Sequence, residues 1–240
     1  TRSSLLAGPR KDPLPVLRVT EIYPAIMGES RHSGWPCTIV RLTGCHRRCV
    51  YCDTAYAFHG GEKLAVADVL ARVGELGHRM LLVTGGEPLL QPAVVELMRD
   101  GLAAGLEVVV ETSGTTGAPV ALADLPDGVS RVVDVKTPGS GIAADQIDWA
   151  GLAALGPDDE LKLVLCDEAD YRWARELLTD GLEVAGLRRR LPAGVPVTVS
   201  PGWGALAPAD LAGWVLRDHL PVRFQVQLHK VVWPDAERGV

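Results

Sequence analysis

The sequence predicts an α/β fold, a partial and open TIM-like barrel of about six parallel strands. Short apolar runs of strand length alternate along the chain with longer segments whose apolar residues recur at helical spacing. This alternation predicts right-handed βαβ units and therefore a parallel sheet. A complete barrel of this kind has eight strands, so a count of six indicates a barrel that stays open.

Six segments carry the strand pattern, a short apolar run that ends at glycine, proline or polar residues. They are residues 37–42, 80–84, 107–112, 132–135, 161–165 and 197–200. Residues 16–23, which precede the first strand, alternate between apolar and polar side chains. The functional site of such a barrel lies at the C-terminal ends of its strands, so the polar residues at those ends are the candidate site residues.

Five segments have the apolar spacing of amphipathic helices. They are residues 64–76, 92–102, 145–155, 169–178 and 208–219. Residues 1–14 mix Ser, Gly, Pro and charged residues without a period, and we expect a flexible segment there. We expect residues 15–240 to form one domain, because a chain of 240 residues that is 47% hydrophobic suits a single core.

Charge and composition disfavour several classes of partner. The formal net charge of -6 provides no basic surface for nucleic acid. No apolar run reaches the length that crosses a bilayer, and the first residues lack the apolar region of a signal peptide, so we expect a cytoplasmic protein without a membrane partner. Five cysteines, an odd number with three close together, favour a reducing compartment over a disulfide framework.

Three cysteines follow the first strand at the spacing CxxxCxxC: Cys45, Cys49 and Cys52. A structural zinc ion takes four protein ligands, and a cubane iron–sulfur cluster is usually held by four cysteines. A set of three therefore leaves one metal position open, where a reactive ligand can bind. The alternative is a zinc site completed by Cys37 or His46, although the sequence has no second CxxC pair.

The cysteine spacing resembles that of the radical S-adenosylmethionine (SAM) enzymes. Seven segments in order, IMGES, GWP, RLTGCHRRCVYCDT, TGGEP, ETSGT, DVKTPGSG and QLHK, are similar to the 7-carboxy-7-deazaguanine synthase family. They run from about Glu21 to Pro234, which is nearly the whole chain. The resemblance implies a radical SAM core with reduced helices, and a [4Fe-4S] cluster whose open iron is chelated by SAM.

The resemblance also implies a set of SAM contacts. The implied residues are Tyr51, Cys52, Asp53, Gly85, Gly86, Glu87, Ser113, Asp134, Val135, Lys136 and Ser200. Among them, Gly86 and Glu87 would hold the methionyl amino group. Lys136 follows an apolar strand, and burial of its charge would require an anion such as the carboxylate of SAM. Ser113 and Ser200 could instead be satisfied polar groups at strand ends.

The substrate that the resemblance implies is 6-carboxy-5,6,7,8-tetrahydropterin. Its recognition would need an acid for the guanidine-like edge, a cation for the carboxylate and an apolar slot for the ring. Glu29 fits the first role, and Arg41 and His229 fit the second. The implied substrate contacts are Ile26, Met27, Gly28, Glu29, Arg41, Thr84, Glu111 and His229. Thr54 would ligate a Mg2+ ion that also contacts the substrate, or it could simply cap the following turn.

The implied reaction begins with reductive cleavage of SAM and removal of hydrogen from C6 of the pterin. Ring contraction and loss of ammonia then give 7-carboxy-7-deazaguanine. The resemblance further implies a homodimer and an electron donor such as flavodoxin or ferredoxin. Two alternatives stay open: an activating enzyme for a glycyl-radical protein, and a non-catalytic zinc or iron–sulfur module. The chain departs from the family pattern at Met27, where glutamine is usual, and at His46, where asparagine is usual.

Overall fold

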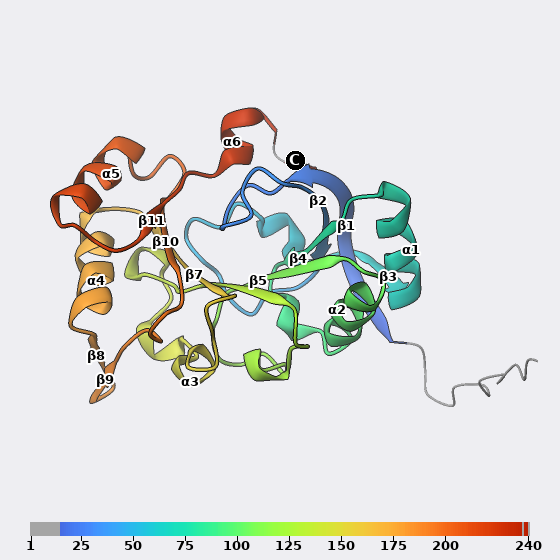
Figure 1. Cartoon of the computed structure of the whole chain (residues 1–240), viewed down its shortest axis with the longest axis horizontal. Coiled ribbons are helices and arrows are strands. Elements are labelled where there is room, and N and C mark those ends of the chain that lie inside the picture. The colour runs from blue at the N-terminus through green and yellow to red at the C-terminus, as the bar shows by residue number, and fades with distance from the viewer. Residues whose placement is uncertain (1–14, 237, 240) are drawn as a thin grey trace, which may run out of the picture.

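A nine-stranded sheet forms the framework of the protein, whose computed structural model describes residues 15–236, 238 and 239 (Figure 1). The strand order is β11-β10-β7-β6-β5-β4-β2-β1-β3. Its six central parallel strands are β2 (Pro36–Leu42), β4 (Met80–Gly85), β5 (Glu107–Thr112), β6 (Ser130–Asp134), β7 (Glu160–Leu165) and β10 (Val197–Pro201). These are the six predicted strands, each within two residues of the expected bounds. The sheet remains open, with β11 at one edge and β3 at the other, so the predicted open barrel is confirmed.

The remaining strands are antiparallel or very short. β1 (Val16–Ile26) pairs antiparallel with both β2 and β3 (Glu62–Ala65), which extends the sheet beyond its parallel part. The alternation over residues 16–23 marks β1, whose side chains Leu17 and Val19 are buried. Sequence reasoning missed β3, β8 (Leu182–Val184), β9 (Leu187–Arg189) and β11 (Arg223–Phe224), because two to four residues are too few to show a period.

Four helices lie where the apolar spacing predicts them. They are α1 (Val66–Leu76), α2 (Val94–Ala103), α4 (Glu168–Thr179) and α5 (Pro208–Arg217). In Figure 1, α4 and α5 lie at the β10 end of the sheet and α1 and α2 at the β1 end. Single 3-10 turns connect other elements at Ala55–Phe58, Pro88–Leu90, Leu122–Asp124, Pro138–Ser140 and Ala144–Gln146. In the described part of the chain, no helix has the length and apolarity that a membrane crossing requires.

The helix predicted over residues 145–155 is wrong in extent, because only one turn forms there, α3 (Trp149–Leu152). The backbone of Ile147 instead forms a β-bridge with Thr115. Asp148 then begins the helix by accepting a hydrogen bond from the backbone N–H of Gly151 at 2.9 Å. A second single turn, α6 (Leu228–Val232), begins within the QLHK segment and ends two residues beyond it, and the sequence did not predict this helix. The expected flexible segment, residues 1–14, lies outside the described residues.

The two faces of the sheet differ in what covers them. A large apolar cluster packs between the helices and one face, and it includes Val40, Leu81 and Val110. A smaller cluster on neighbouring positions of the same strands includes Ile39, Leu82, Val109 and Val132. Because side chains alternate along a strand, the residues two positions beyond this smaller cluster share its face. Those residues are Arg41, Thr84, Glu111 and Asp134.

Candidate active site

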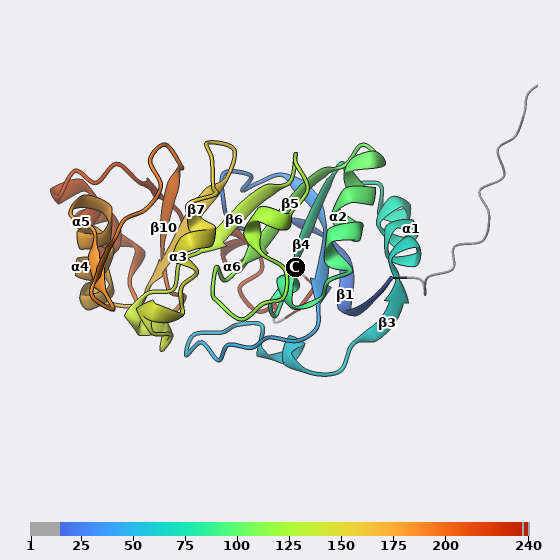
Figure 2. The ribbon, with the colours of Figure 1, turned by 90° about the horizontal axis from the view of Figure 1, so that it is seen from below.

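A cavity of about 310 Å³ lies over this inner face, at the C-terminal ends of the strands. Ile39, Leu82, Val132 and Val164 give it an apolar floor, and charged side chains rise from the same strands. The segment between β2 and β3, light blue in Figure 2, runs below the strand ends and carries the three cysteines. The cavity therefore lies where the cysteine segment and the strand ends meet.

The backbone of the cysteine loop is held at several points. The N–H of Gly44 donates to the carbonyl of Ala57 at 2.8 Å, and the N–H of Val50 donates to the carbonyl of Ser140 at 3.0 Å. The Arg48 guanidinium donates to the carbonyl of Cys45 at 2.9 Å. All of these contacts use polar groups of the loop other than the thiols, which stay available for metal. The five cysteines of the chain are all free.

Gly85 and Gly86 allow β4 to contact the cysteine loop directly. The N–H of Gly86 donates to the carbonyl of Leu42 at 3.1 Å, and the N–H of Glu87 donates to the carbonyl of Gly44 at 2.8 Å. A Cβ atom on Gly86 would lie 2.9 Å from Cβ of Cys45 and closer still to the Gly44 carbonyl. The glycine pair is thus required by the packing of the cysteine loop, and both residues also line the cavity.

Glu87 is buried, and its side chain does not line the cavity. The side chain is 1% exposed. Oε1 accepts hydrogen bonds from the Thr112 hydroxyl at 2.7 Å and the Leu89 N–H at 3.1 Å. Oε2 accepts from the Ser113 N–H at 2.9 Å and the Ser113 hydroxyl at 2.6 Å. The carboxylate therefore joins the turn after β4 to the end of β5.

The three thiols fit an iron–sulfur cluster better than a zinc ion. Among the described residues, no three His, Cys, Asp or Glu side chains are placed to hold a single metal ion. Cys37 lies at the opposite end of β2, where burial raises the pKa of its thiol to about 12. His46 Nε2 is 3.0 Å from the Thr116 carbonyl and so faces another loop. Cys37 is therefore not available as a fourth ligand of a zinc site, whereas the buried Nδ1 of His46 has no partner among the described residues.

Burial raises the pKa of the Cys45 and Cys49 thiols above the usual range. The backbone N–H of Arg47 lies 3.4 Å from Cys45 Sγ and works against this effect, as does the positive charge of Lys136 near Cys49. Metal binds the thiolate form, so each thiol with a raised pKa must lose its proton to solvent when it binds metal. Cys49 and Cys52 both line the cavity, so a cluster bound there would face it.

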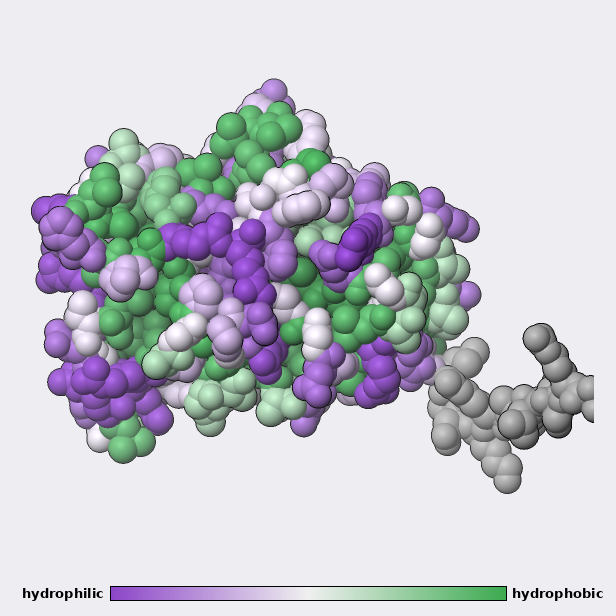
Figure 3. Space-filling view, in the orientation of Figure 1, coloured by the Kyte–Doolittle hydropathy of each residue, from purple (hydrophilic) through white to green (hydrophobic). Residues whose placement is uncertain are grey.

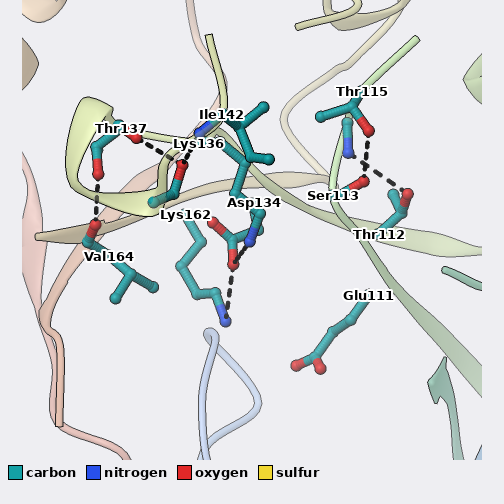
Figure 4. Close-up of polar contacts among 12 residues, drawn as sticks. Glu111, Thr112, Ser113, Thr115, Asp134, Lys136, Thr137, Ile142, Lys162 and Val164 are labelled. Atoms are coloured by element: carbon teal, nitrogen blue, oxygen red, sulfur yellow. Dashed lines mark hydrogen bonds and ion pairs between the residues drawn. The ribbon is translucent and has the colours of Figure 1, made fainter. Parts of the chain in front are cut away.

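A network of buried charges forms the cavity wall on the β6 and β7 side (Figure 4). Lys136 Nζ is 2.8 Å from Asp134 Oδ2, and Lys162 Nζ is 2.8 Å from Glu29 Oε2. Burial alone would lower the pKa of Lys136, but Asp134 and Cys49 outweigh it and raise that pKa. The anion that Lys136 was expected to need is thus supplied by Asp134 within the chain.

Glu111 projects into the same space from β5 (Figure 4). The Thr84 hydroxyl lies 3.4 Å from its Oε2. Burial raises the pKa of the Glu111 carboxyl, and the positive charge of Lys162 only partly offsets this.

Arg41 is held on the opposite side of the cavity. Its Nε donates to Glu21 Oε1 at 2.7 Å, and its Nη2 donates to the Tyr23 hydroxyl at 2.8 Å. The Tyr56 hydroxyl donates to the same Glu21 oxygen at 2.7 Å. Burial disfavours the charged guanidinium, but Tyr23, Tyr56 and Glu21 outweigh it and raise the pKa of Arg41. Arg41 is therefore a fixed cation that lines the cavity.

The helix α6 covers part of the cavity with residues from the C-terminal segment. The N–H of Leu228 donates to the carbonyl of Gly28 at 2.9 Å, and the His229 ring packs so closely on Gly28 that a Cβ there would meet Nδ1. Burial lowers the pKa of His229, which keeps the ring neutral at neutral pH. Beside it, the Thr54 hydroxyl donates to Asp53 Oδ1 at 2.8 Å, which leaves its own oxygen able to accept or ligate.

Most of the expected site residues therefore come together around one cavity. Those that line it are Ile26, Met27, Gly28, Glu29, Arg41, Cys49, Tyr51, Cys52, Asp53, Thr54, Thr84, Gly85, Gly86, Glu111, Ser113, Asp134, Lys136 and His229. Cys45, Glu87, Val135 and Ser200 do not line it. Val135 is fully buried in the apolar core because it alternates with Asp134, and Ser200 is buried at the end of β10.

Sequence reasoning missed several residues of the cavity wall. They are Thr112, Lys162, Gly202, Trp203, Gln227 and Lys230, besides the apolar floor. Lys162 could have been found, because a lysine inside the apolar strand Leu161–Leu165 needs a buried anion by the same reasoning as Lys136. Gln227 and Lys230 flank the predicted His229 within the QLHK segment, so that motif could have marked them as well.

Residues 39–137 match the Radical SAM superfamily, the class of enzymes that the open sheet and the three-cysteine loop define. The whole chain is similar to curated proteins named 7-carboxy-7-deazaguanine synthase. That of Koribacter versatilis is 40% identical over 93% of this chain and 100% of the relative, and that of Chlorobaculum tepidum is 38% identical over 93% and 97%. The chain belongs to the 7-carboxy-7-deazaguanine synthase family.

Solved structures agree on the fold. The crystal structure of QueE from Escherichia coli superposes with a TM-score of 0.68 at 21% identity, and covers 89% of this chain and 95% of that one. Streptococcus suis SuiB bound to the precursor peptide SuiA superposes with a TM-score of 0.55 at 12% identity over 81% of this chain and 49% of that chain. At these identities the likeness concerns the fold alone.

Proposed function

We propose that this chain catalyses the radical SAM ring contraction of 6-carboxy-5,6,7,8-tetrahydropterin to 7-carboxy-7-deazaguanine with loss of ammonia. The observation that carries this proposal is the single cavity into which the cysteine loop, the buried acids and the fixed Arg41 all face. Family membership supports the same reaction. A glycyl-radical activating enzyme must admit a protein backbone, whereas charged groups on opposite sides of an apolar floor suit a small, polar, planar ligand.

Cys45, Cys49 and Cys52 would hold the cluster, and Tyr51, Gly86, Asp134 and Lys136 would contact SAM. When bound, the cluster and SAM supply the 5'-deoxyadenosyl radical that removes hydrogen from C6 of the pterin. Asp134 Oδ1 and the Tyr51 hydroxyl are buried and have no hydrogen-bond partner among the described residues, and both side chains line the cavity. Such orphaned atoms are expected where a polar ligand completes the site. The residues present therefore fit the cofactor.

The pterin would lie over the apolar floor between two charged walls. Glu29 would accept hydrogen bonds from the amino-pyrimidinone edge, and Arg41 would pair with the substrate carboxylate. His229, kept neutral by burial, would donate a single hydrogen bond to the same carboxylate without adding a charge. Glu111 would present its carboxyl group to the ring from β5. A ligand packed on the apolar floor would displace water from it, which would strengthen each of these polar contacts.

We also propose that Thr54 ligates a Mg2+ ion together with the substrate. The hydroxyl of Thr54 donates its proton to Asp53, so its oxygen can turn a lone pair toward a cation. Mg2+ needs several further oxygens, which substrate and water would provide. The electron would come from a small redox protein such as flavodoxin or ferredoxin, and the enzyme would act as a homodimer.

The test is anaerobic reconstitution with iron and sulfide, followed by SAM, reductant, Mg2+ and the pterin. We expect 7-carboxy-7-deazaguanine and ammonia in equal amounts, detected by mass spectrometry and by an ammonia assay. 5'-Deoxyadenosine formed without any pterin-dependent product would favour the activating enzyme. Absence of both products from a cluster-loaded protein would overturn the proposal altogether.

A further inference from the structure

Lys162 joins two parts of the cavity wall that lie far apart in the sequence. It projects from β7, and its Nζ is 2.8 Å from Oε2 of Glu29, on the turn after β1, and 3.8 Å from Oδ2 of Asp134, at the end of β6. Figure 4 shows the Lys162 side chain reaching the Asp134 carboxylate, with the Glu111 carboxylate pointing into the same space. Burial alone would lower the pKa of Lys162, but Glu29, Asp134 and Glu111 outweigh it and raise that pKa. The lysine is therefore a cation.

Each of the two carboxylates has one oxygen fixed by a lysine and one oxygen without a donor. Oε2 of Glu29 receives the hydrogen bond from Lys162 at 2.8 Å, whereas Oε1 is buried and has no partner among the described residues. In Asp134, Oδ2 receives a hydrogen bond from Lys136, whereas Oδ1 is buried and has no partner among the described residues. A buried acceptor without a donor costs free energy. Both side chains line the cavity, so a bound ligand can supply the missing donors.

We propose that Lys162 is a positioning residue that holds the Glu29 carboxylate by Oε2, so that Oε1 accepts from the N–H groups of the amino-pyrimidinone edge of the pterin. This inference rests on the proposed function. Lys162 thereby sets specificity for a ligand that carries the exocyclic amino group, because a ligand without that group leaves Oε1 unpaired.

A purely structural role explains Lys162 less well. A buried ion pair contributes little net stability, and well-packed apolar side chains in its place are often as stable or more so. The neighbouring inner-face positions Val164 and Val132 carry such apolar side chains. A lysine at this position is therefore accounted for by the carboxylates that it orients toward a ligand.

The test is a double-mutant cycle on pterin binding. Equilibrium dialysis of cluster-loaded protein with SAM and Mg2+, but without reductant, measures the pterin Kd in the absence of turnover. We expect Lys162→Met and Glu29→Gln each to raise the Kd about tenfold or more. In the Glu29→Gln background, Lys162→Met should raise it further by less than about threefold. A pterin analogue without the exocyclic amino group should bind all three variants about equally.

The matched control is Lys136→Met, which removes a buried lysine that forms its ion pair with Asp134 and not with Glu29. The factor by which Lys136→Met changes the pterin Kd should multiply with the factor for Glu29→Gln. If the effects of Lys162→Met and Glu29→Gln on the pterin Kd multiply, the role of Lys162 is overturned. It is also overturned if the Lys162→Met variant discriminates against the analogue as strongly as the wild type does. If Lys162→Met does not load the cluster, Lys162→Gln retains a donor toward Glu29, and failure of both variants to load would also overturn it. A wild-type protein that does not bind the pterin would instead overturn the proposed function.

Discussion

Gly86 packs directly on Cys45, so that a Cβ atom on Gly86 would lie only 2.9 Å from the Cβ of that cysteine. The glycine segment after β4 and the cysteine loop after β2 are thus built against each other. Backbone hydrogen bonds from Gly86 to Leu42 and from Glu87 to Gly44 hold the same contact. The position of the cluster ligands therefore depends on a strand that contributes no ligand of its own.

Gly86→Ala should displace the cysteine loop, because the backbone of Gly44 cannot move aside as a flexible side chain could. We expect a loss of about 1–3 kcal/mol in the free energy of unfolding and a clear loss of iron and sulfide after reconstitution. The matched control is Gly74→Ala, since Gly74 lies within α1 with open space around it. That change should stabilise the protein by about 0.5–1 kcal/mol. Full cluster loading in Gly86→Ala would contradict the packing role of Gly86.

Cys37→Ala should leave the cluster intact, because Cys37 lies in the apolar core at the far end of β2. We expect iron and sulfide contents equal to those of the wild type, with a stability cost of about 1 kcal/mol. Its thiol, whose pKa burial raises to about 12, should also resist iodoacetamide at pH 8 in the folded protein. Cys49→Ala, measured in parallel, should lose the cluster. Equal iron loss in both variants would favour a site that includes Cys37.

Thr54→Ala should retain the cluster and SAM cleavage but lose the response to Mg2+. Thr54→Ser, which keeps the hydroxyl, should retain that response. We expect the Mg2+ concentration for half-maximal turnover to rise about tenfold or more in the alanine variant. The measurement is turnover against Mg2+ concentration in the three proteins. An alanine variant with the same Mg2+ dependence as the wild type would exclude Thr54 as a ligand.

His229 should make the protein less stable as the pH falls below about 6.5. Because burial lowers its pKa in the folded state, the unfolded chain takes up the proton first, and acid therefore favours unfolding. We expect the thermal midpoint of the wild type to decrease relative to that of His229→Gln between pH 7.5 and 5.5. The comparison cancels the contribution of Glu111, whose raised pKa acts in the opposite direction.

The exposed His59, which lies outside the cavity wall, provides the control variant His59→Gln. Thermal unfolding of the three reconstituted proteins in anaerobic buffers measures the difference between their thermal midpoints directly. A wild-type midpoint that stays parallel to that of His229→Gln over this pH range would show that His229 is not buried as described.

The parallel strands and the residues at their ends could be predicted, because both follow from local patterns. An apolar run of four to six residues marks a buried strand, and alternation then places Glu111 and Asp134 on one face and Val135 on the other. The same alternation, applied to positions within a strand as well as at its end, would have placed Lys162 on the face of the site. Glu87 is different, because its four hydrogen bonds reach residues up to 26 positions away. A local sequence pattern cannot reveal such contacts.

The C-terminal part of the site was the least predictable. The helix α6 has one turn, too short for a period, and it is placed by contacts with Gly28 about 200 residues earlier. Its residues Val231 and Val232 are exposed, and Figure 3 shows a hydrophobic surface there at the top of the view. The QLHK motif indicated His229 as a site residue, but only the fold shows that this segment covers the cavity.

The central claim is that the cysteine loop and the pterin share one cavity. Its most direct test uses a pterin that carries deuterium at C6, incubated with cluster-loaded protein, SAM, Mg2+ and reductant. We predict that mass spectrometry finds deuterium in the 5'-deoxyadenosyl group of SAM or in 5'-deoxyadenosine, together with 7-carboxy-7-deazaguanine. Product formed with no deuterium in the adenosyl group, or deoxyadenosine formed without any uptake of deuterium from the pterin, would contradict the account.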